Sequence, residues 1–175
     1  MEAAIQQHAV PTKAEFHMAI ARRADRWYSA CLKITRSPDL AADAVQDALL
    51  SAWSKRSQFG SSARLETWIH RIAINSALQL LRKCKPDRFA ALETEIPDES
   101  ISPHDSLADT QLESRLAVAL KELTDIERVC FVLKHFEQWR LKEIADELGT
   151  NVGVIKQALF RAVRKLRVNM ADMRS

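Results

Sequence analysis

Apolar residues recur at helical spacing after Ser37, where three helix-start signals coincide. Ser37 can cap a helix with its hydroxyl, Pro38 suits the first helical position because its missing N–H is not needed there, and Asp39 is favoured by the helix dipole. The apolar residues that follow repeat at i, i+3, i+4, i+7 and i+8. They are Val45, Ala48, Leu49, Ala52 and Trp53. The pattern predicts an amphipathic helix with one buried face.

The other side of this predicted helix carries a mixed stripe of two carboxylates, an amide and a leucine. Its members are Asp43, Gln46, Asp47 and Leu50. A solvated helix surface is the simpler interpretation. An exposed leucine among acidic side chains also suits a docking site for a basic partner helix.

A second predicted helix spans about Arg64 to Lys83 and follows a polar loop over residues 59–63. Its expected core positions share one face: Leu65, Trp68, Ile69, Ile72, Ser76 and Leu80. Another face mixes the cations and amides that reach phosphates and base edges: Arg71, Asn75, Gln79 and Arg82. Of the four tryptophans, only Trp68 is expected to stack on a base, because it lies beside the polar loop. The others are expected to be buried.

The last third of the chain opens with a capping-box pattern, Thr124 to Glu127, which predicts a helix through about Glu137. The residues expected to face inward are Ile126, Val129, Cys130 and Leu133. A short amphipathic helix follows, and Gly149 is expected to end it in the left-handed conformation. Its inward positions are Leu141, Ile144, Ala145 and Leu148.

Asn151 can cap one more helix, which completes a helix-turn-helix whose second member enters the DNA major groove. Its inward positions are Ile155, Leu159, Ala162 and Leu166. Its outward residues are Lys156, Gln157, Phe160, Arg161 and Arg164. Arginine and lysine pair with guanine or phosphate, glutamine with adenine, and phenylalanine with the thymine methyl. Helical hairpins with a glycine turn also occur in proteins that bind no DNA.

The composition predicts an all-α fold of two small helical domains joined by an acidic linker. The 175 residues include only three glycines and five prolines, so little interrupts a helix. Residues 1–85 carry 13 basic and 7 acidic side chains, residues 86–120 carry 2 and 8, and residues 121–175 carry 11 and 8. Two basic blocks on one tether are compatible with bivalent binding to a polyanion, although such an excess is common on protein surfaces.

Several function classes find no support in the sequence. The cysteines at 31, 84 and 130 form no Cys-x-x-Cys pair, the histidines show no metal-ligand spacing, and no phosphate loop or nucleophile elbow appears. We therefore expect no catalytic residues, no cofactor, no metal and no small-molecule substrate. No apolar run approaches the ~20 residues of a membrane span and no signal sequence is evident, so we expect a cytoplasmic protein without membrane insertion.

Taken together, the two blocks resemble the bacterial extracytoplasmic-function (ECF) sigma factors of RNA polymerase, over nearly the whole chain. Residues 43–53, DAVQDALLSAW, are similar to the family's polymerase-clamp-binding helix. Residues 59–83, which include TWIHRIAIN at 67–75, are similar to its melting and −10-reading segment. Residues 143–149, EIADELG, followed by VGVIK at 152–156, are similar to its −35-reading helix-turn-helix.

The resemblance implies a residue-level assignment. Residues 1–85 would be sigma region two, 86–111 an acidic flexible linker, and 112–175 sigma region four. The residues implied to bind core RNA polymerase are Asp43, Gln46, Asp47 and Leu50. Those implied to bind and melt the −10 DNA are Ser61, Ser62, Trp68, Arg71, Asn75 and Arg82. Those implied to bind −35 DNA are Lys156, Gln157, Phe160, Arg161 and Arg164. An anti-sigma factor is a further implied partner, beside polymerase and promoter DNA.

The chain departs from the family pattern at a few recognition positions. Val154, Gln157, Ala158 and Val163 replace the usual threonine, serine, arginine and arginine, and Gln79 replaces an aspartate. We expect these changes to alter or weaken −35 reading rather than the fold. Two alternatives stay open: a sigma-like decoy that only binds an anti-sigma factor, and a conventional helix-turn-helix regulator whose first block self-associates.

Overall fold

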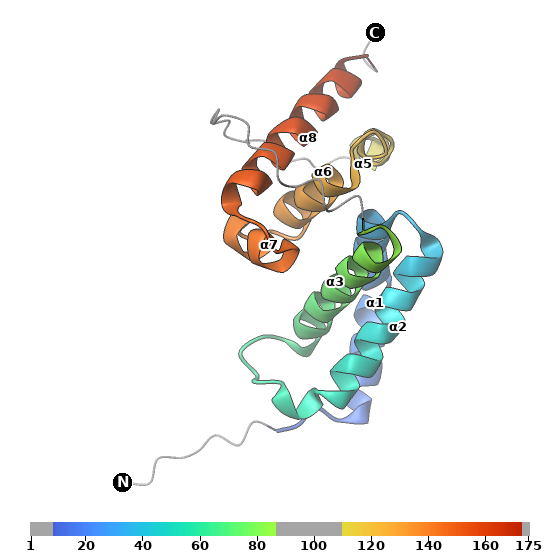
Figure 1. The fold of residues 1–175 in the computed structure, drawn as a ribbon. Helices are drawn as coiled ribbons and strands as arrows, with labels where there is room; N and C mark the ends of the chain where they lie inside the picture. The colour runs from blue at the N-terminus through green and yellow to red at the C-terminus, as the bar shows by residue number, and fades with distance from the viewer. Residues whose placement is uncertain (1–8, 87–109, 173–175) are drawn as a thin grey trace. The chain divides into compact units, whose positions relative to one another are not determined.

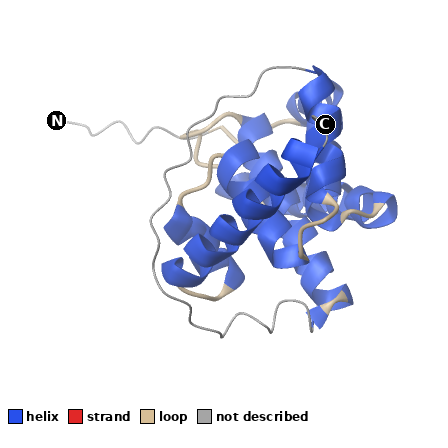
Figure 2. Ribbon diagram, turned by 90° about the horizontal axis from the view of Figure 1, so that it is seen from above, coloured by secondary structure: helices blue, strands red, loops and turns tan. Residues whose placement is uncertain are grey.

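The computed structural model describes residues 9–86 and 110–172, and within these ranges the regular structure is helical, with no strand. Figure 2 shows this helical content. The chain divides into two compact units, Met1–Cys84 and Lys85–Ser175. These observations confirm the predicted all-α class with two helical domains. The predicted linker, residues 86–111, lies almost entirely outside the described residues.

The first unit is a bundle of three helices, α1 (Lys13–Thr35), α2 (Pro38–Ser54) and α3 (Leu65–Cys84), each of which packs on the other two (Figure 1). A short 3₁₀ turn, η1 (Arg56–Gln58), follows α2. The predicted start of α2 is confirmed, because the Leu40 N–H donates to Ser37 Oγ at 3.3 Å and Pro38 occupies the first turn. Trp27 and Ile34 of α1 are fully buried in the bundle.

The buried face of α2 is a stripe of small residues: Ala41, Ala44, Ala48 and Ala52. Val45 and Leu49 are only half-buried, and Trp53 is 38% exposed. The prediction that Trp53 is buried was therefore wrong. Each of these larger residues follows an alanine of the stripe directly, and one residue turns a helix by about 100°. They consequently lie at the edge of the helix interface. At its centre, the small alanine side chains let the backbone of α2 approach the neighbouring helices closely.

The buried face of α3 also differs from the predicted one. The fully buried residues are Ile69, Ala73, Ile74, Ala77, Leu78 and Leu81. Of the predicted core positions only Ile69 is among them, whereas Leu65, Trp68, Ile72, Ser76 and Leu80 are half-buried. Because α3 packs against both α1 and α2, its buried arc is wide and is centred between the two neighbours. The sequence alone offers two apolar stripes and does not say which one faces the bundle.

The second unit consists of α5 (Thr110–Leu120), α6 (Asp125–Phe131), α7 (Leu141–Leu148) and α8 (Val152–Asp172). The predicted helix to Glu137 is interrupted, because α6 changes at Val132 into a π-helical segment, η2 (Val132–Phe136). The backbone N–H of Trp139 then donates to the Leu133 carbonyl at 2.9 Å, and the Trp139 side chain is buried. Val129, Cys130 and Leu133 are buried as predicted, whereas Ile126 is half-buried.

The helix-turn-helix of α7 and α8 is confirmed, with its glycine turn and its asparagine cap. Gly149 ends α7 in the left-handed conformation at φ 65°. The Val154 N–H donates to Asn151 Oδ1 at 3.0 Å and so caps α8. The buried positions of α8 are Ile155, Ala158, Ala162 and Leu166. Leu159, which was predicted to be buried, is half-buried, and Ala158 takes its place in the core.

Candidate protein and nucleic-acid interfaces

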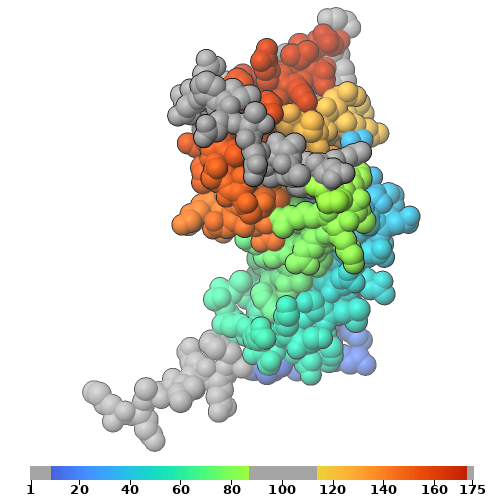
Figure 3. Space-filling view, viewed as in Figure 1, coloured from blue at the N-terminus to red at the C-terminus, as the bar shows by residue number. Residues whose placement is uncertain are grey.

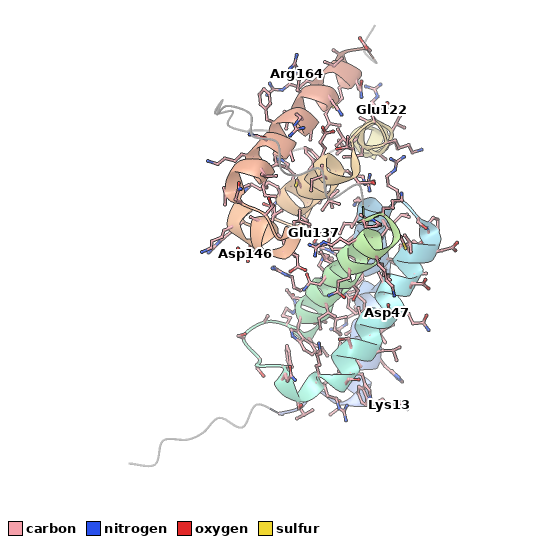
Figure 4. The ribbon with its side chains drawn as sticks, viewed as in Figure 1. Lys13, Asp47, Glu122, Glu137, Asp146 and Arg164 are labelled. Atoms are coloured by element: carbon pink, nitrogen blue, oxygen red, sulfur yellow. The ribbon has the colours of Figure 1, made fainter. Side chains whose placement is uncertain are left out.

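The predicted mixed stripe of α2 is on the surface of the first unit. All four members are exposed, and Leu50 is 63% exposed; we call this set the acidic α2 surface: Asp43, Gln46, Asp47 and Leu50. In Figure 4 the labelled Asp47 projects from α2 away from the other two helices. Figure 3 shows α2, in light blue to cyan, on the visible face of this unit. An apolar knob flanked by carboxylates on a rigid helix can dock a helix that is both basic and apolar.

The exposed apolar surface extends one turn beyond Leu50. Trp53 is held by Phe16 of α1, with ring centroids 5.1 Å apart in an edge-on arrangement. The Arg56 guanidinium lies 4.0 Å from the centroid of the Trp53 ring, and its Nη1 donates to the Trp53 carbonyl at 2.7 Å. Sequence reasoning missed this cluster because it expected Trp53 inside the core. The arrangement fixes a large aromatic ring beside the acidic α2 surface.

The polar loop before α3 is anchored by an aromatic pair. Phe59 and Trp68 lie with ring centroids 5.3 Å apart, which holds the loop against the first turn of α3. Ser61 and Ser62 are exposed between them, and Ser61 has the left-handed φ of 52°. Phe59 was not among the predicted site residues, although its position opposite Trp68 across a short loop was a usable signal. Trp68 is half-buried, and its ring is tilted by 51° to that of Phe59.

The polar residues of α3 continue from Trp68 along one side of the helix. Arg71, Asn75 and Arg82 follow it at i+3, i+7 and i+14, so the structure does bring these predicted residues together. Arg71 is exposed, and Asn75 and Arg82 are half-buried. The Asn75 Oδ1 is buried and has no hydrogen-bond partner among the described residues. It is an acceptor at the centre of an otherwise cationic side.

The outward side of α8 is basic. Lys156, Arg161 and Arg164 are exposed, and Figure 4 labels Arg164 on the outer side of this helix. Gln157 and Phe160 are half-buried, which corrects the expectation of a solvent-exposed phenylalanine. All five lie within one arc of α8, so the structure brings the predicted residues together. This side can present cations and an amide to a DNA groove.

The first turn of α6 contains charged side chains that sequence reasoning treated only as a helix start. Asp125 and Arg128 pair at 2.8 Å with 3% and 1% of their side chains exposed. Glu127 completes the capping box with Thr124 and also binds Lys165 of α8 at 2.8 Å. The capping box was predicted, but the pairing across to α8 was not, because nothing local in the sequence connects two residues so far apart.

The three cysteines and the described histidines differ in burial and in pKa. Cys31 and Cys130 are buried and Cys84 is exposed, all as free thiols. Burial, with a smaller contribution from Glu127, raises the pKa of Cys130 from 9.0 to about 12. Burial lowers the pKa of His135, whose ring lies 4.6 Å from that of Phe131. Within residues 9–86 and 110–172, no group of histidine, cysteine and carboxylate side chains is arranged to hold a metal ion. No helix in these ranges has the length and apolarity that a bilayer span requires.

Two family models match the chain, one on each unit. The model described as Sigma-70 region 2 matches residues 19–85. The model described as Sigma-70, region 4 matches residues 113–166. The first range contains the acidic α2 surface and the polar side of α3, and the second contains the helix-turn-helix.

Two solved structures share the fold of this chain. The sigma factor RpoE of Bartonella quintana, in complex with the anti-sigma factor NepR, has a TM-score of 0.57 at 23% identity, over 90% of this chain and 97% of that one. CnrH, in complex with the cytosolic domain of CnrY, has a TM-score of 0.54 at 24% identity, over 94% of this chain and 92% of that one.

Sequence relatives extend over nearly the full chain. The ECF RNA polymerase sigma factor SigW of Bacillus subtilis is 26% identical over 159 residues, with 85% of both chains covered. The sigma factor SigV of the same organism is 29% identical, over 91% of this chain and 93% of that one. The RNA polymerase sigma factor CarQ of Myxococcus xanthus is 30% identical, with 90% of both chains covered. With both sigma regions matched and a relative that is 30% identical over 90% of both chains, the chain belongs to the ECF family of sigma-70-type RNA polymerase sigma factors.

Proposed function

We propose that this promoter-directing sigma factor works through three separate surfaces. The acidic α2 surface binds core RNA polymerase, the loop with the polar side of α3 captures and melts the −10 DNA, and α8 reads the −35 DNA. In this proposal residues 1–85 act as region two, residues 112–175 as region four, and residues 86–111 as the linker between them. The observation that carries the proposal is that each of these surfaces is accessible on a folded unit.

The acidic α2 surface is suited to polymerase binding by its chemistry. Leu50 offers an exposed apolar contact, and Asp43 and Asp47 flank it with negative charge on a capped helix that packs against α1 and α3. A basic partner helix would bury the leucine and pair with the carboxylates, and such complementarity gives orientation as well as affinity. Trp53, fixed by Phe16 and Arg56, offers a second anchor at the end of the same surface.

The loop and α3 are suited to capturing an unpaired base. Extruding a base costs a few kcal/mol, which contacts to the flipped base must offset. Ser61 and Ser62 provide exposed hydroxyls, Trp68 provides an aromatic edge, and the half-buried Asn75 lies on the same side of α3. Arg71 and Arg82 extend the same side with positive charge for the phosphates of a single strand.

The outward side of α8 is suited to duplex DNA. Arg161 and Lys156 can reach guanine or phosphate, Gln157 can bridge adenine, and Phe160 offers an edge to a thymine methyl. Of the departures from the family pattern, Ala158 is buried, while Val154, Gln157 and Val163 are half-buried. We expect them to change which −35 sequence is read.

An anti-sigma factor is a further proposed partner. One solved structure of the same fold is a sigma factor in complex with the anti-sigma factor NepR, and another is CnrH in complex with the cytosolic domain of CnrY. A partner that silences this chain would need to cover the acidic α2 surface or the basic side of α8. We further propose that the chain has no catalytic role, needs no cofactor, and acts in the bacterial cytoplasm, where polymerase and promoters are.

Two charge variants separate the proposed surfaces. Asp47→Lys should weaken binding to core polymerase at least tenfold, because it places a cation against a basic partner, while leaving duplex DNA binding by the free chain intact. Arg161→Ala should do the reverse. Core binding is measured by competition with a labelled wild-type chain, and DNA binding by anisotropy on promoters selected from a randomised library.

Matched controls are Asp25→Lys, at an exposed carboxylate of α1, and Lys121→Ala, at an exposed cation after α5. Neither should change either assay. Equal loss of both activities in Asp47→Lys and Arg161→Ala would show that the surfaces are not separate. If both variants kept both activities, the two surfaces would have been assigned to the wrong residues.

A further inference from the structure

One carboxylate oxygen joins two elements of the second unit. Glu127 Oε2 accepts the Thr124 N–H at 3.0 Å and the Lys165 ammonium at 2.8 Å. Only 4% of the Glu127 side chain is exposed, whereas 42% of the Lys165 side chain is exposed. The carboxylate is therefore fixed within the start of α6, and the lysine of α8 reaches inward to it.

Lys165 lies among the cations that are proposed to contact DNA. It follows Arg164 directly and Arg161 by one turn, and these three residues border one surface hollow of about 460 Å³ between α8 and the end of α5. Figure 4 labels two residues of its border, Arg164 and Glu122. A lysine stem is long and flexible, so an unpaired ammonium at this position would reach the same phosphates as its neighbours.

The neighbouring pair supports a specific function for Glu127. Asp125 and Arg128 pair with each other at 2.8 Å within the same buried turn, so that turn already holds a balanced ion pair. Glu127 instead directs its charge across to α8. Removing the lysine from a buried carboxylate is unfavourable, because an unpaired buried charge loses its hydration without compensation. The Glu127–Lys165 contact should therefore persist when α8 binds DNA.

We propose that Glu127 is a positioning residue that withholds Lys165 from the DNA backbone. The inference rests on the proposed −35 role of α8. Phosphate contacts raise affinity for every sequence alike, whereas base contacts distinguish sequences. By neutralising one cation at the edge of the recognition side, Glu127 lowers sequence-independent binding and leaves discrimination to the residues that face the bases.

The salt dependence of DNA binding tests this proposal on the full-length chain with a random-sequence duplex. Glu127→Gln should release Lys165 to a phosphate and make the slope of log K against log salt steeper by about 0.9. Each doubling of the salt concentration would then reduce the affinity of the variant about twofold more than that of the wild type. Lys165→Met should leave the slope at the wild-type value. Glu127→Gln with Lys165→Met should return to that value. Glutamine can still serve in a capping box, and thermal unfolding by circular dichroism checks that each variant is folded.

Sequence discrimination is the second measurement. The ratio of affinities for a selected promoter duplex and the random duplex should fall several-fold in Glu127→Gln and recover in the double variant. A slope that falls by about 0.9 in Lys165→Met would show that Lys165 already binds phosphate, and would overturn the proposal. An unchanged slope in Glu127→Gln would overturn it as well. Arg161→Ala serves as the reference, because an unchanged slope there would instead mean that α8 does not contact DNA.

Discussion

At the scale of single residues, burial decides which chemistry is available to the chain. The three cysteines illustrate this, because the same side chain lies in different environments. Cys31 is fully buried and its Sγ lies 3.5 Å from the Ala73 carbonyl, whereas Cys84 is exposed at the end of α3. Only a thiolate reacts readily, so both accessibility and pKa control the outcome.

We expect a sharp difference in alkylation of the native protein. At mildly alkaline pH, iodoacetamide should modify Cys84 and spare Cys130, whose pKa is raised to about 12 by burial and by Glu127. In denaturant all three cysteines should react. The Cys130 thiol ionises near pH 9 in the unfolded chain but stays protonated at that pH in the folded protein. The free energy of unfolding should therefore fall as the pH rises above 9. Mass spectrometry of the modified peptides checks the first point, and rapid native modification of Cys130 would contradict it.

At the scale of elements, the helix ends follow directly from the sequence. Ser37, Thr124, Gly149 and Asn151 act as caps where the pattern predicted them, because a cap depends on residues within one turn of itself. Gly149 has the most specific requirement, with a φ of 65° that other residues adopt only with strain.

Gly149→Ala should therefore lower the free energy of unfolding by about 1 kcal/mol, because alanine has a steric penalty in the left-handed conformation. Gly60→Ala is the matched control. Neither glycine has an atom within 4 Å of an added Cβ, but only Gly149 has a positive φ. Urea denaturation of both variants measures the difference. Equal stability of the two would contradict the assigned role of the glycine turn.

The faces of the helices were harder to predict than their ends. Trp53 was expected inside but is 38% exposed, and the buried Ile74 was not among the predicted core positions. Periodicity gives the spacing of an apolar stripe, but which stripe is buried depends on the neighbouring helices, and α3 has two of them. The acidic α2 surface was found from sequence because its members recur at helical spacing on a side that the apolar positions of α2 leave exposed. The Glu127–Lys165 pair was not, because it joins positions 38 residues apart.

At the scale of the whole molecule, the chain combines two independently packed units, each with its own core and its own exposed surfaces. In the second unit one cluster joins α5 to α8: Leu116, Ala119, Leu120, Leu123, Ala162 and Leu166. Contacts made by one unit can thus change without loss of packing in the other. A sigma factor built this way can divide promoter binding from strand opening.

Permanganate reactivity of −10 thymines in holoenzyme–promoter complexes tests the proposed division of labour between the two units. Arg161→Ala should weaken promoter occupancy. Once the variant holoenzyme saturates the promoter, the −10 thymines should be as reactive as with the wild type, because the first unit still melts the DNA. Trp68→Leu should occupy the promoter but show little reactivity even at saturation. If Arg161→Ala failed to open saturated promoters, or Trp68→Leu opened them fully, the two units would not have the separate tasks assigned to them.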